Sequence, residues 1–270
     1  MKKVVLITGA SSGMGKETAK LLLQQGYTVY AAARRMDRMA DLQPLGGKVL
    51  SMDVTDDAAM TKGIEKIIAD EGRIDVLVNN AGFGSYGAVE DVPMADARYQ
   101  MEVNVFGLAR LTQLVIPHMR EQRSGKIINI TSIGGKIVTP FGAWYHASKF
   151  AVEALSDAMR LELKAFNIQV VVVEPGGVKT EWGAIAMDHL QKISGQGVYK
   201  PMVDRILATM PGIEQKAAEP SVIATLIAKI IALRKPRTRY HAGYMASTVL
   251  TLRKVLPDRI FDAALMSQLK

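Results

Sequence analysis

Short, almost entirely apolar runs alternate along this chain with longer segments of helical periodicity. The clearest runs are the four valines Val170–Val173 and the segment Val4–Ile7. Strands of this kind are buried on both faces, as in parallel sheets that helices cover on either side. The alternation therefore predicts an α/β fold, a Rossmann-type, doubly wound parallel sheet of about seven strands flanked by helices.

Apolar runs and helical patterns locate the expected elements. Six strands and a weaker seventh are expected at Val4–Thr8, Thr28–Ala33, Lys48–Asp53, Val76–Asn79, Lys126–Thr131, Gln169–Glu174 and Thr238–His241. Helices are expected at Lys16–Gln25, Ala58–Glu71, Ala95–Glu121, Trp144–Phe166 and Ser221–Leu233. Gly26 follows the first helix, where a left-handed cap residue is typical. Right-handed crossovers would place the loops after the strands along one edge of the sheet.

No linker, repeat or low-complexity tract divides the chain, so a single domain covering residues 1–270 is expected. Residues 180–220 contain no strand pattern and are rich in Met, Gly and Pro. This segment is too long for a simple connection and is expected to form a substrate lid with short helices. Residues 244–270 mix apolar and basic side chains and are expected to form a C-terminal extension.

Charge and residue usage exclude several classes of function. The net charge is +8, but no basic stripe with interleaved aromatic residues is present, so we predict no nucleic-acid binding. The absence of cysteine excludes disulfides and thiolate chemistry, and the four histidines lack ligand spacing, so we predict no metal site. The first apolar run is too short for a signal peptide, and no run reaches the roughly 18 residues of a membrane span. A cytoplasmic location is expected.

The stretch "TGASSGMG" at Thr8–Gly15 follows the first expected strand and precedes the first helix. Gly9 would let the chain turn, Gly13 would let the backbone approach a pyrophosphate, and Gly15 would let the helix pack close to the sheet. The helix N-terminus would direct N–H groups and partial positive charge at an anion. The spacing departs from the common G-x-G-x-x-G pattern by an extra residue, so this loop alone fits both a dinucleotide cradle and a plain turn.

Two arginines, Arg34 and Arg35, end the second expected strand, where a carboxylate normally meets a free ribose 2′-hydroxyl. Guanidinium groups suit a 2′-phosphate, so these residues favour NADP(H), with NAD(H) the weaker alternative because Asp37 lies nearby. Asp53, at the end of the third expected strand, is placed to bind an adenine amino group. Its structural alternative is a turn or a helix cap ahead of Ala58.

Tyr145 and Lys149 are four residues apart in "WYHASKF", which places them on one face of a helix. A nearby ammonium would lower the tyrosine pKa from its usual value near 10, so that Tyr145 could transfer a proton near neutral pH. The bare spacing also fits a helix in which both side chains only pack and contact solvent.

Taken together, these motifs resemble the short-chain dehydrogenase/reductase family, in its compact single-domain branch. The resemblance covers about the first 180 residues and rests on motifs in the family's order. They are the glycine loop, "DV" at Asp53-Val54, "NNAG" at Asn79–Gly82, Asn104 in "VNVFG", Ser132 in "NITS", "YHASK" at Tyr145–Lys149 and "PGGVKT" at Pro175–Thr180. The flanking segments are most similar to the subgroup of 17β-hydroxysteroid and retinol dehydrogenases.

The resemblance implies four catalytic residues. Tyr145 would be the general acid that protonates a carbonyl oxygen, and Ser132 would orient that oxygen. Lys149 would lower the tyrosine pKa and hold the nicotinamide ribose, while Asn104 would bend its helix and anchor a water of a proton relay. Tyr145 and Ser132 would then stabilise the developing alkoxide charge.

The resemblance also implies a site for NADP(H) at the edge of the sheet. Asn80 is expected to brace the sheet rather than to contact substrate, and Gly177 stands where larger residues often occur. The expected cofactor-binding residues are Gly9, Ser11, Ser12, Gly13, Met14, Gly15, Arg34, Arg35, Asp53, Val54, Asn80, Ala81, Gly82, Tyr145, Lys149, Pro175, Gly176, Val178 and Thr180.

The resulting hypothesis is an NADP(H)-dependent oxidoreductase that interconverts a carbonyl and a secondary alcohol by hydride transfer. An apolar substrate is indicated by lid residues Trp182, Met187, Leu190, Met202 and Met210. The alternatives are a non-catalytic NADP-binding sensor or scaffold, and a membrane-associated steroid or lipid dehydrogenase that docks through residues 244–270. Because helices 95–121 and 144–166 pair subunits in the family, a homodimer or homotetramer is expected.

Overall fold

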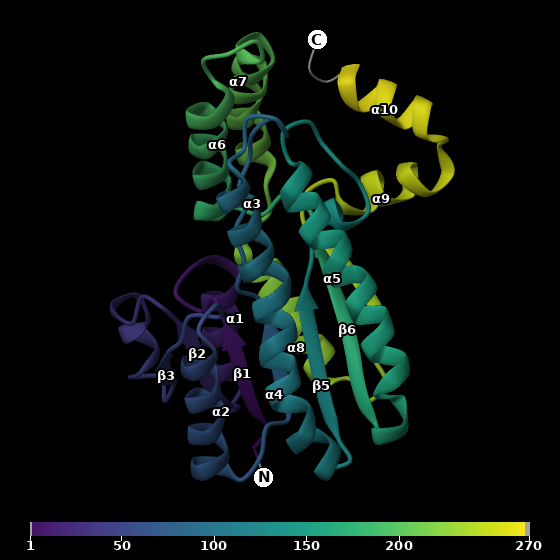
Figure 1. Ribbon diagram of the computed structural model, residues 1–270. Helices are drawn as coiled ribbons and strands as arrows, with labels where there is room; N and C mark the ends of the chain where they lie inside the picture. Colours follow the sequence, from purple (N-terminus) through teal and green to yellow (C-terminus); the bar gives the residue numbers. More distant parts are fainter. Residues whose placement is uncertain (1, 268–270) are drawn as a thin grey trace.

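A seven-stranded sheet forms the centre of the computed structural model, which describes residues 2–267 (Figure 1). The strand order is β3-β2-β1-β4-β5-β6-β7, and all neighbouring strands are parallel. The strands are β1 (Val4–Thr8), β2 (Thr28–Ala33), β3 (Lys48–Ser51), β4 (Val76–Asn79), β5 (Gly125–Ile130), β6 (Ile168–Pro175) and β7 (Arg239–Ala242). The predicted doubly wound parallel sheet is confirmed.

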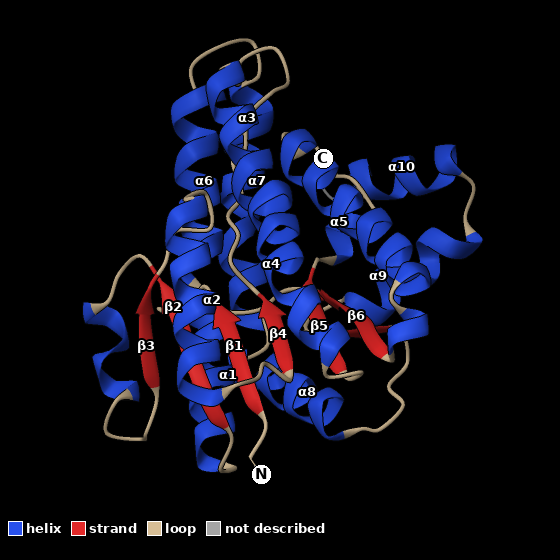
Figure 2. Cartoon of the chain, turned by 60° about the horizontal axis from the view of Figure 1, so that its bottom comes forward, coloured by secondary structure: helices blue, strands red, loops and turns tan. Residues whose placement is uncertain are grey.

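Helices cover both faces of this sheet (Figure 2). One face carries α1 (Gly13–Gln24) and α8 (Pro220–Ala232), which pack against each other. The opposite face carries α2 (Asp57–Glu71), α4 (Leu108–Glu121) and α5 (Ala143–Glu162). Strand β1 supplies both cores, since Val5 and Ile7 point to the first face and Val4 and Leu6 to the second. This alternation explains why the strand sequence is apolar throughout.

Two element boundaries differ from expectation in ways that matter for function. Helix α1 begins at Gly13 rather than at Lys16, so the second half of the glycine loop is itself the first helical turn. Strand β3 ends at Ser51, which leaves Asp53 and Val54 on the following loop. The predicted glycine cap is confirmed, because Gly26 has a φ of +82° after the end of α1.

The long helix expected at 95–121 is interrupted around Asn104, where a bend was predicted. It consists of α3 (Met94–Met101), a π-helical turn (Glu102–Gly107) and α4. The π-helical turn contains Asn104, whose side-chain amide forms hydrogen bonds with the backbone of Phe83 on the loop after β4. Such π-turns occur frequently at functional sites.

The 180–220 segment forms two helices that project beyond the sheet's carboxyl edge (Figure 1). They are α6 (Glu181–Ser194), of 14 residues, and α7 (Lys200–Lys216), of 17 residues, so the expectation of short helices is wrong. Apolar residues of both helices, among them Leu190 and Val203, form a small core together with Tyr86, Phe141 and Tyr145, and this packing stabilises helices of this length.

The C-terminal extension forms α9 (Ala246–Val255) and α10 (Asp258–Ser267), on the other side of the same end of the molecule (Figure 1). Residues 268–270 of the predicted extension lie outside the described residues. No helix within residues 2–267 is both long enough and apolar enough to cross a membrane.

The order of the strands identifies where a ligand would bind. Strands β1, β2 and β3 are added in one direction, and β4 then pairs with the other side of β1. The loops after β1 and β4 therefore diverge at a topological switch point, which is the usual binding crevice of open α/β sheets. These are the loops that contain "TGASSGMG" and "NNAG".

Candidate active site

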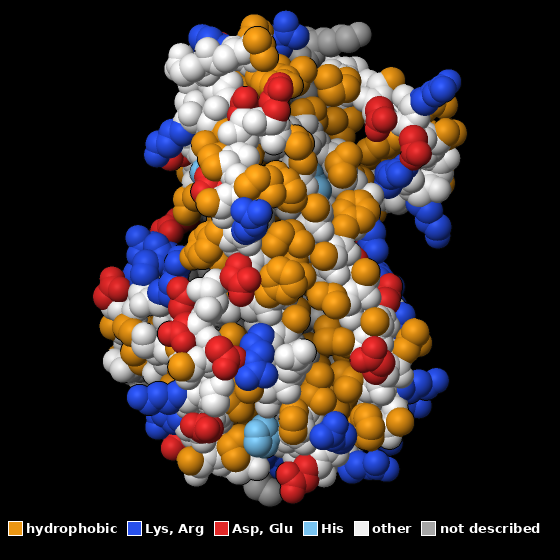
Figure 3. All heavy atoms as spheres, viewed as in Figure 1, with side chains coloured by type: hydrophobic (Ala, Val, Ile, Leu, Met, Phe, Trp, Pro, Cys, Tyr) orange, Lys and Arg blue, Asp and Glu red, His pale blue; other side chains and the backbone are white. Residues whose placement is uncertain are grey.

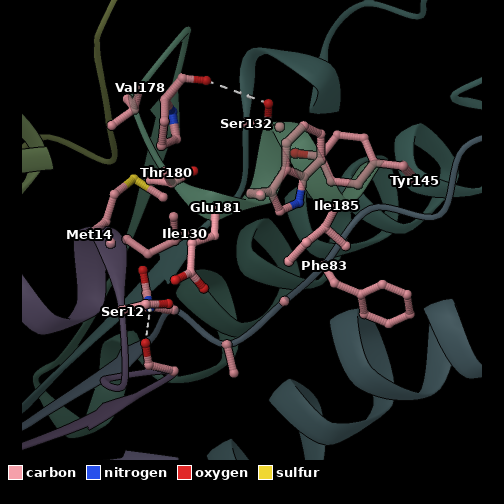
Figure 4. Close-up of a pocket in the computed structure, with 18 of the residues that line it drawn as sticks. Ser12, Met14, Phe83, Ile130, Ser132, Tyr145, Val178, Thr180, Glu181 and Ile185 are labelled. Atoms are coloured by element: carbon pink, nitrogen blue, oxygen red, sulfur yellow. Dashed lines mark hydrogen bonds between the residues drawn. The ribbon is translucent and has the colours of Figure 1, made fainter. Parts of the chain in front are cut away.

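A cavity of about 890 Å³ lies at this switch point, at the carboxyl edge of the sheet. Figure 4 shows that side chains from the glycine loop, the end of β5, the loop after β6 and helix α6 surround it. Most of the predicted site residues line this cavity, including the three residues Ser132, Tyr145 and Lys149. Residues from widely separated parts of the chain are thus brought to one place.

The glycine loop has the geometry of a cradle that side chains would fill. Gly9 and Gly13 adopt φ values of +65° and +52°, which favour glycine. A Cβ on Gly9 would lie 2.9 Å from the Cα of Ala81, and one on Gly15 would lie 2.5 Å from the carbonyl oxygen of Gly9. Glycine at position 15 therefore lets the first turn of α1 lie close to the residues that follow β1 and β4.

The first turn of α1 is open to an anion. Among residues 2–267 no side chain caps this helix end, and the first turn contains no acidic residue. The backbone N–H groups and the partial positive charge of the helix N-terminus therefore face the cavity unopposed. Together with the glycine cradle, this arrangement fits the pyrophosphate of a dinucleotide.

Asn80 braces the crevice, as predicted. Its side-chain amide donates to the carbonyl oxygens of Thr8, at 3.0 Å, and Gly9, at 3.3 Å. Ala81 and Gly82 follow it along the cavity wall. A Cβ on Gly82 would lie 3.1 Å from Oδ1 of Asn104 and 3.6 Å from Nζ of Lys149, so glycine keeps this part of the wall narrow.

Both predicted arginines line the far end of the cavity. Arg34 donates to the hydroxyl of Tyr99 at 3.1 Å and lies 3.8 Å from the carboxylate of Asp53. Arg35 lies 3.4 Å from the hydroxyl of Ser11. Because the side chains of Arg34 and Arg35 are 67% and 47% exposed, their guanidinium groups are accessible to a ligand.

Asp53 has a structural task as well as a place in the cavity wall. Its Oδ1 accepts from the backbone N–H and the hydroxyl of Thr55, at 3.0 and 2.9 Å. The helix cap considered for it belongs instead to Asp56, which accepts from the N–H of Ala59 because α2 begins at Asp57. Asp53 therefore shapes the turn after β3.

The predicted catalytic residues converge from three elements. Ser132 follows β5, accepts from the N–H of Gly134 at 3.0 Å and lies 3.5 Å from the carbonyl oxygen of Pro175 (Figure 4). Tyr145 and Lys149 lie on α5, each with 7% of its surface exposed. The ammonium of Lys149 donates to the carbonyl oxygen of Ile130 at 3.0 Å.

Burial controls the ionisation of this group. It raises the pKa of Tyr145 to about 12, although the neighbouring hydroxyl of Ser132 acts in the opposite direction. The net shift is thus opposite to the expected lowering of the tyrosine pKa, because desolvation by burial is the largest influence on it. Burial also lowers the pKa of Lys149 to about 8, against the opposing influence of Glu153.

The side chain of Asn104 is fully engaged by the protein. Its Oδ1 accepts from the N–H of Phe83 at 3.1 Å, and its Nδ2 donates to the carbonyl oxygen of Phe83 and to the hydroxyl of Ser148, both at 3.0 Å. These bonds position the π-helical turn against α5. The water of a proton relay stays a prediction for this residue.

The loop after β6 is attached to the C-terminal segment. Gly177 and Tyr244 exchange two backbone hydrogen bonds of 3.0 Å, and a Cβ on Gly176 would collide with the carbonyl oxygen of Tyr244. The glycines at 176 and 177 thus leave room for Tyr244 behind the loop. This contact explains why glycine stands at position 177, where larger residues often occur in the family. The loop's other face, with Val178 and Thr180, lines the cavity.

Aromatic and aliphatic side chains close the cavity around Tyr145. The ring centroids of Tyr145 and Trp182 are 4.9 Å apart, and that of Tyr86 is 5.9 Å from both. Of the apolar residues predicted to meet substrate, Trp182 and Met210 line the cavity. Met187, Leu190 and Met202 instead form the core between α6 and α7, so their predicted contact with substrate is wrong.

Sequence reasoning missed a charged network behind the site. Glu153 on α5 accepts from the hydroxyl of Thr131 at 2.7 Å and pairs with Lys136 at 2.9 Å and Arg239 at 3.0 Å. Glu174, next to Pro175, lies 3.8 Å from Arg239. This network connects the ends of β5, β6 and β7, which no local sequence pattern could indicate.

The family profile described as short chain dehydrogenase matches residues 3–189. This chain belongs to the short-chain dehydrogenase/reductase family. Two of its relatives are similar over nearly their whole length. The 3-ketodihydrosphingosine reductase of Bacteroides thetaiotaomicron is 38% identical over 267 residues, which cover 97% of this chain and 96% of the relative. The NADPH-dependent 3-dehydrocapnine reductase of Ornithobacterium rhinotracheale is 32% identical over 279 residues, with 99% and 98% coverage.

Solved structures agree with this family membership. A short-chain dehydrogenase from Streptomyces avermitilis has a TM-score of 0.81 and 33% identity, covering 99% of this chain and 96% of that one. Actinorhodin polyketide ketoreductase with NADPH has a TM-score of 0.76 and 30% identity, covering 89% and 95%. The protein is thus a short-chain dehydrogenase/reductase-type oxidoreductase, and its relatives support carbonyl or alcohol substrates and a nicotinamide cofactor.

Glu174 makes the stability of this site dependent on pH. Burial, and next the charge of Glu153, raise its pKa from 4.5 to about 7, and Oε1 has no hydrogen-bond partner within residues 2–267. Between pH 4.5 and pH 7 the folded chain binds more protons at Glu174 than the unfolded chain does. The free energy of unfolding therefore falls as the pH rises from about 4.5 through 7. Glu174→Gln should remove this fall, which amounts to up to about 3 kcal/mol. Urea unfolding at pH 5 and pH 8 measures it.

Glu65→Gln, on the exposed face of α2, is the matched control and should retain the pH dependence of the unmodified protein. An equal loss of stability between pH 5 and pH 8 in Glu174→Gln and in the unmodified protein would contradict the role assigned to Glu174.

Proposed function

We propose that the protein is an NADPH-dependent carbonyl reductase in which Tyr145 protonates the carbonyl oxygen. The observation that carries the proposal is the convergence of Ser132, Tyr145 and Lys149 on the cavity that the glycine loop also lines. The cofactor, when bound, supplies the hydride. The residues of the chain bind the carbonyl group, orient it and provide the proton.

The ionisation of the two α5 residues suits reduction. With a pKa near 12, Tyr145 holds its proton at neutral pH and is ready to donate it. With a pKa near 8, Lys149 remains largely charged at pH 7, and its Nζ lies 5.9 Å from the centre of the Tyr145 ring. An ammonium at this distance stabilises the phenolate that proton donation leaves behind.

Arg34 and Arg35 support NADPH rather than NADH as the cofactor. Both guanidinium groups are exposed at the end of the cavity that follows β2, and a 2′-phosphate there would form charge-assisted bonds with them. The name of one relative, an NADPH-dependent reductase, is consistent with this choice.

The shape and lining of the cavity support a large apolar ketone as substrate. The cavity that contains Tyr145 is also lined by the apolar residues Ile137, Trp182, Ile185, Met210 and Ile213. Two relatives are named for the reduction of 3-ketodihydrosphingosine and 3-dehydrocapnine. A long-chain ketone is therefore the substrate class that we propose for this protein.

Subunit pairing, a cytoplasmic location and membrane docking stay predictions. Phe106, Phe150 and Leu161, on the helices expected to pair subunits, are 55%, 43% and 67% exposed, which supports a homodimer or homotetramer. On the C-terminal extension, Val255 and Ile260 are 65% and 55% exposed and would be available to a membrane surface.

Tyr145→Phe tests the proton donor. The variant retains the ring that packs against Trp182 and loses only the hydroxyl, so NADPH binding should persist while kcat falls by at least about a hundredfold. The measurement is the decrease of NADPH absorbance with a panel of long-chain ketones, alongside NADPH binding by fluorescence. Turnover within a few-fold of the unmodified protein would remove Tyr145 from this role.

Arg34→Asp tests the choice of cofactor. Loss of a charge-assisted bond to the 2′-phosphate should lower the ratio of kcat/KM for NADPH to that for NADH by about 10- to 100-fold. Arg259→Asp makes the same charge change on the exposed surface of α10 and should leave the ratio unchanged. If Arg34→Asp also leaves the ratio unchanged, the 2′-phosphate is bound elsewhere.

A further inference from the structure

An ion pair crosses from the loop after β2 to the first turn of α6. The guanidinium of Arg38 donates to both carboxylate oxygens of Glu181, at 2.7 and 2.9 Å. The same carboxylate lies 3.7 Å from Arg35. Arg38 and Glu181 are 143 residues apart in sequence, so the contact belongs to the fold rather than to a local motif.

Both partners are held in place by their own surroundings. Lys16 donates to the carbonyl oxygen of Arg38 at 2.7 Å and pairs with Asp41 at 2.9 Å, which attaches the 3-10 turn Asp37–Leu42 to α1. The ammonium of Lys16 is thus engaged by this turn. Glu181 is the first residue of α6 and therefore moves with that helix.

A second contact joins α6 to the glycine loop. A Cβ on Gly13 would come within 3.0 Å of Cγ2 of Thr180, so the residue before α6 lies directly over the glycine. Gly13, Arg35, Thr180 and Glu181 all line the cavity, and Figure 4 shows Glu181 between Thr180 and Ser12. One partner of the ion pair, Glu181, therefore lies in the cavity wall beside the glycine loop.

We propose that Arg38 and Glu181 form a clasp over the bound dinucleotide and control the rate at which it leaves. This inference rests on the proposed use of NADPH. A dinucleotide seated on the glycine loop lies between α1 and α6, so α6 must separate from the β2 loop before it can depart. The ion pair holds these two segments together, and breaking it is part of the barrier to release.

The pair is exposed, so its effect on global stability is small. The side chains of Arg38 and Glu181 are 41% and 51% exposed, and exposed pairs contribute about 0–1 kcal/mol. A contribution at the upper end of this range corresponds to a change in release rate of about two- to fivefold. The melting temperature should therefore remain nearly constant when the clasp is removed.

Two single substitutions distinguish the proposed clasp from a purely electrostatic effect, in which Arg38 only attracts the phosphates of the dinucleotide. Glu181→Gln removes a negative charge near the phosphates, whereas Arg38→Gln removes a positive one. Pure electrostatics predicts opposite effects, with slower NADPH release from Glu181→Gln and faster release from Arg38→Gln. A clasp predicts that both variants release NADPH about two- to fivefold faster, and that the double variant is no faster than the faster single one.

The measurement is stopped-flow fluorescence of NADPH displaced by excess NADP⁺, which requires no turnover. Glu219→Gln, which breaks the exposed Lys179–Glu219 pair of 2.6 Å near the base of α6, is the matched control and should leave the release rate unchanged. A release rate of Glu181→Gln equal to or slower than that of the unmodified protein overturns the clasp and leaves the proposed function standing. Failure of the unmodified protein to bind NADPH overturns both.

Discussion

The site depends on a set of hydrogen bonds that joins the loops after β1 and β4. The hydroxyl of Thr8 accepts from the backbone N–H groups of Asn80 and Ala81, at 3.1 and 3.0 Å, while the amide of Asn80 donates back to the carbonyl oxygens of Thr8 and Gly9. These bonds satisfy backbone groups that the diverging strands leave unpaired. They also fix the glycine loop, and hence the start of α1, relative to the rest of the crevice.

Burial is the second constraint on the chemistry. Tyr145 and Lys149 lie in a wall that is closed by Trp182 and Tyr86, and the same desolvation raises the pKa of one and lowers that of the other. The two groups are thereby moved apart in proton affinity, so that the phenol becomes a weaker acid and the ammonium a stronger one. The site thus contains a phenol that holds its proton at neutral pH and an ammonium whose pKa lies close to neutral pH.

The sequence predicted the sheet well because its signal is local. A strand buried on both faces is apolar at consecutive positions, and Val4–Ile7 and Val170–Val173 have this pattern. The motifs that meet at the switch point were likewise predictable, since each is a short segment next to a strand. Gly9 and Gly13 could be assigned their conformational role because few residues other than glycine accept such φ angles.

Features that depend on distant parts of the chain were not predictable. Arg38 and Glu181 carry no motif, and their pairing follows only from how α6 packs over the glycine loop. The Tyr145 pKa was predicted in the wrong direction because a sequence shows the neighbouring lysine but not the depth of burial. Similarly, Met187 and Leu190 pack in the small core beside α6 and α7. Composition alone cannot distinguish apolar residues of such a core from those that line a substrate pocket.

The most direct test of the central claim follows the hydrogen from cofactor to product. The protein is incubated with NADPH that carries deuterium at C4 of the nicotinamide and with a long-chain ketone, and the alcohol is analysed by mass spectrometry. Hydride transfer predicts one deuterium on the carbinol carbon of the product from one of the two C4-labelled isomers of NADPH. Binding of NADPH without any deuterated alcohol, with either isomer and across a panel of long-chain ketones, would contradict the account.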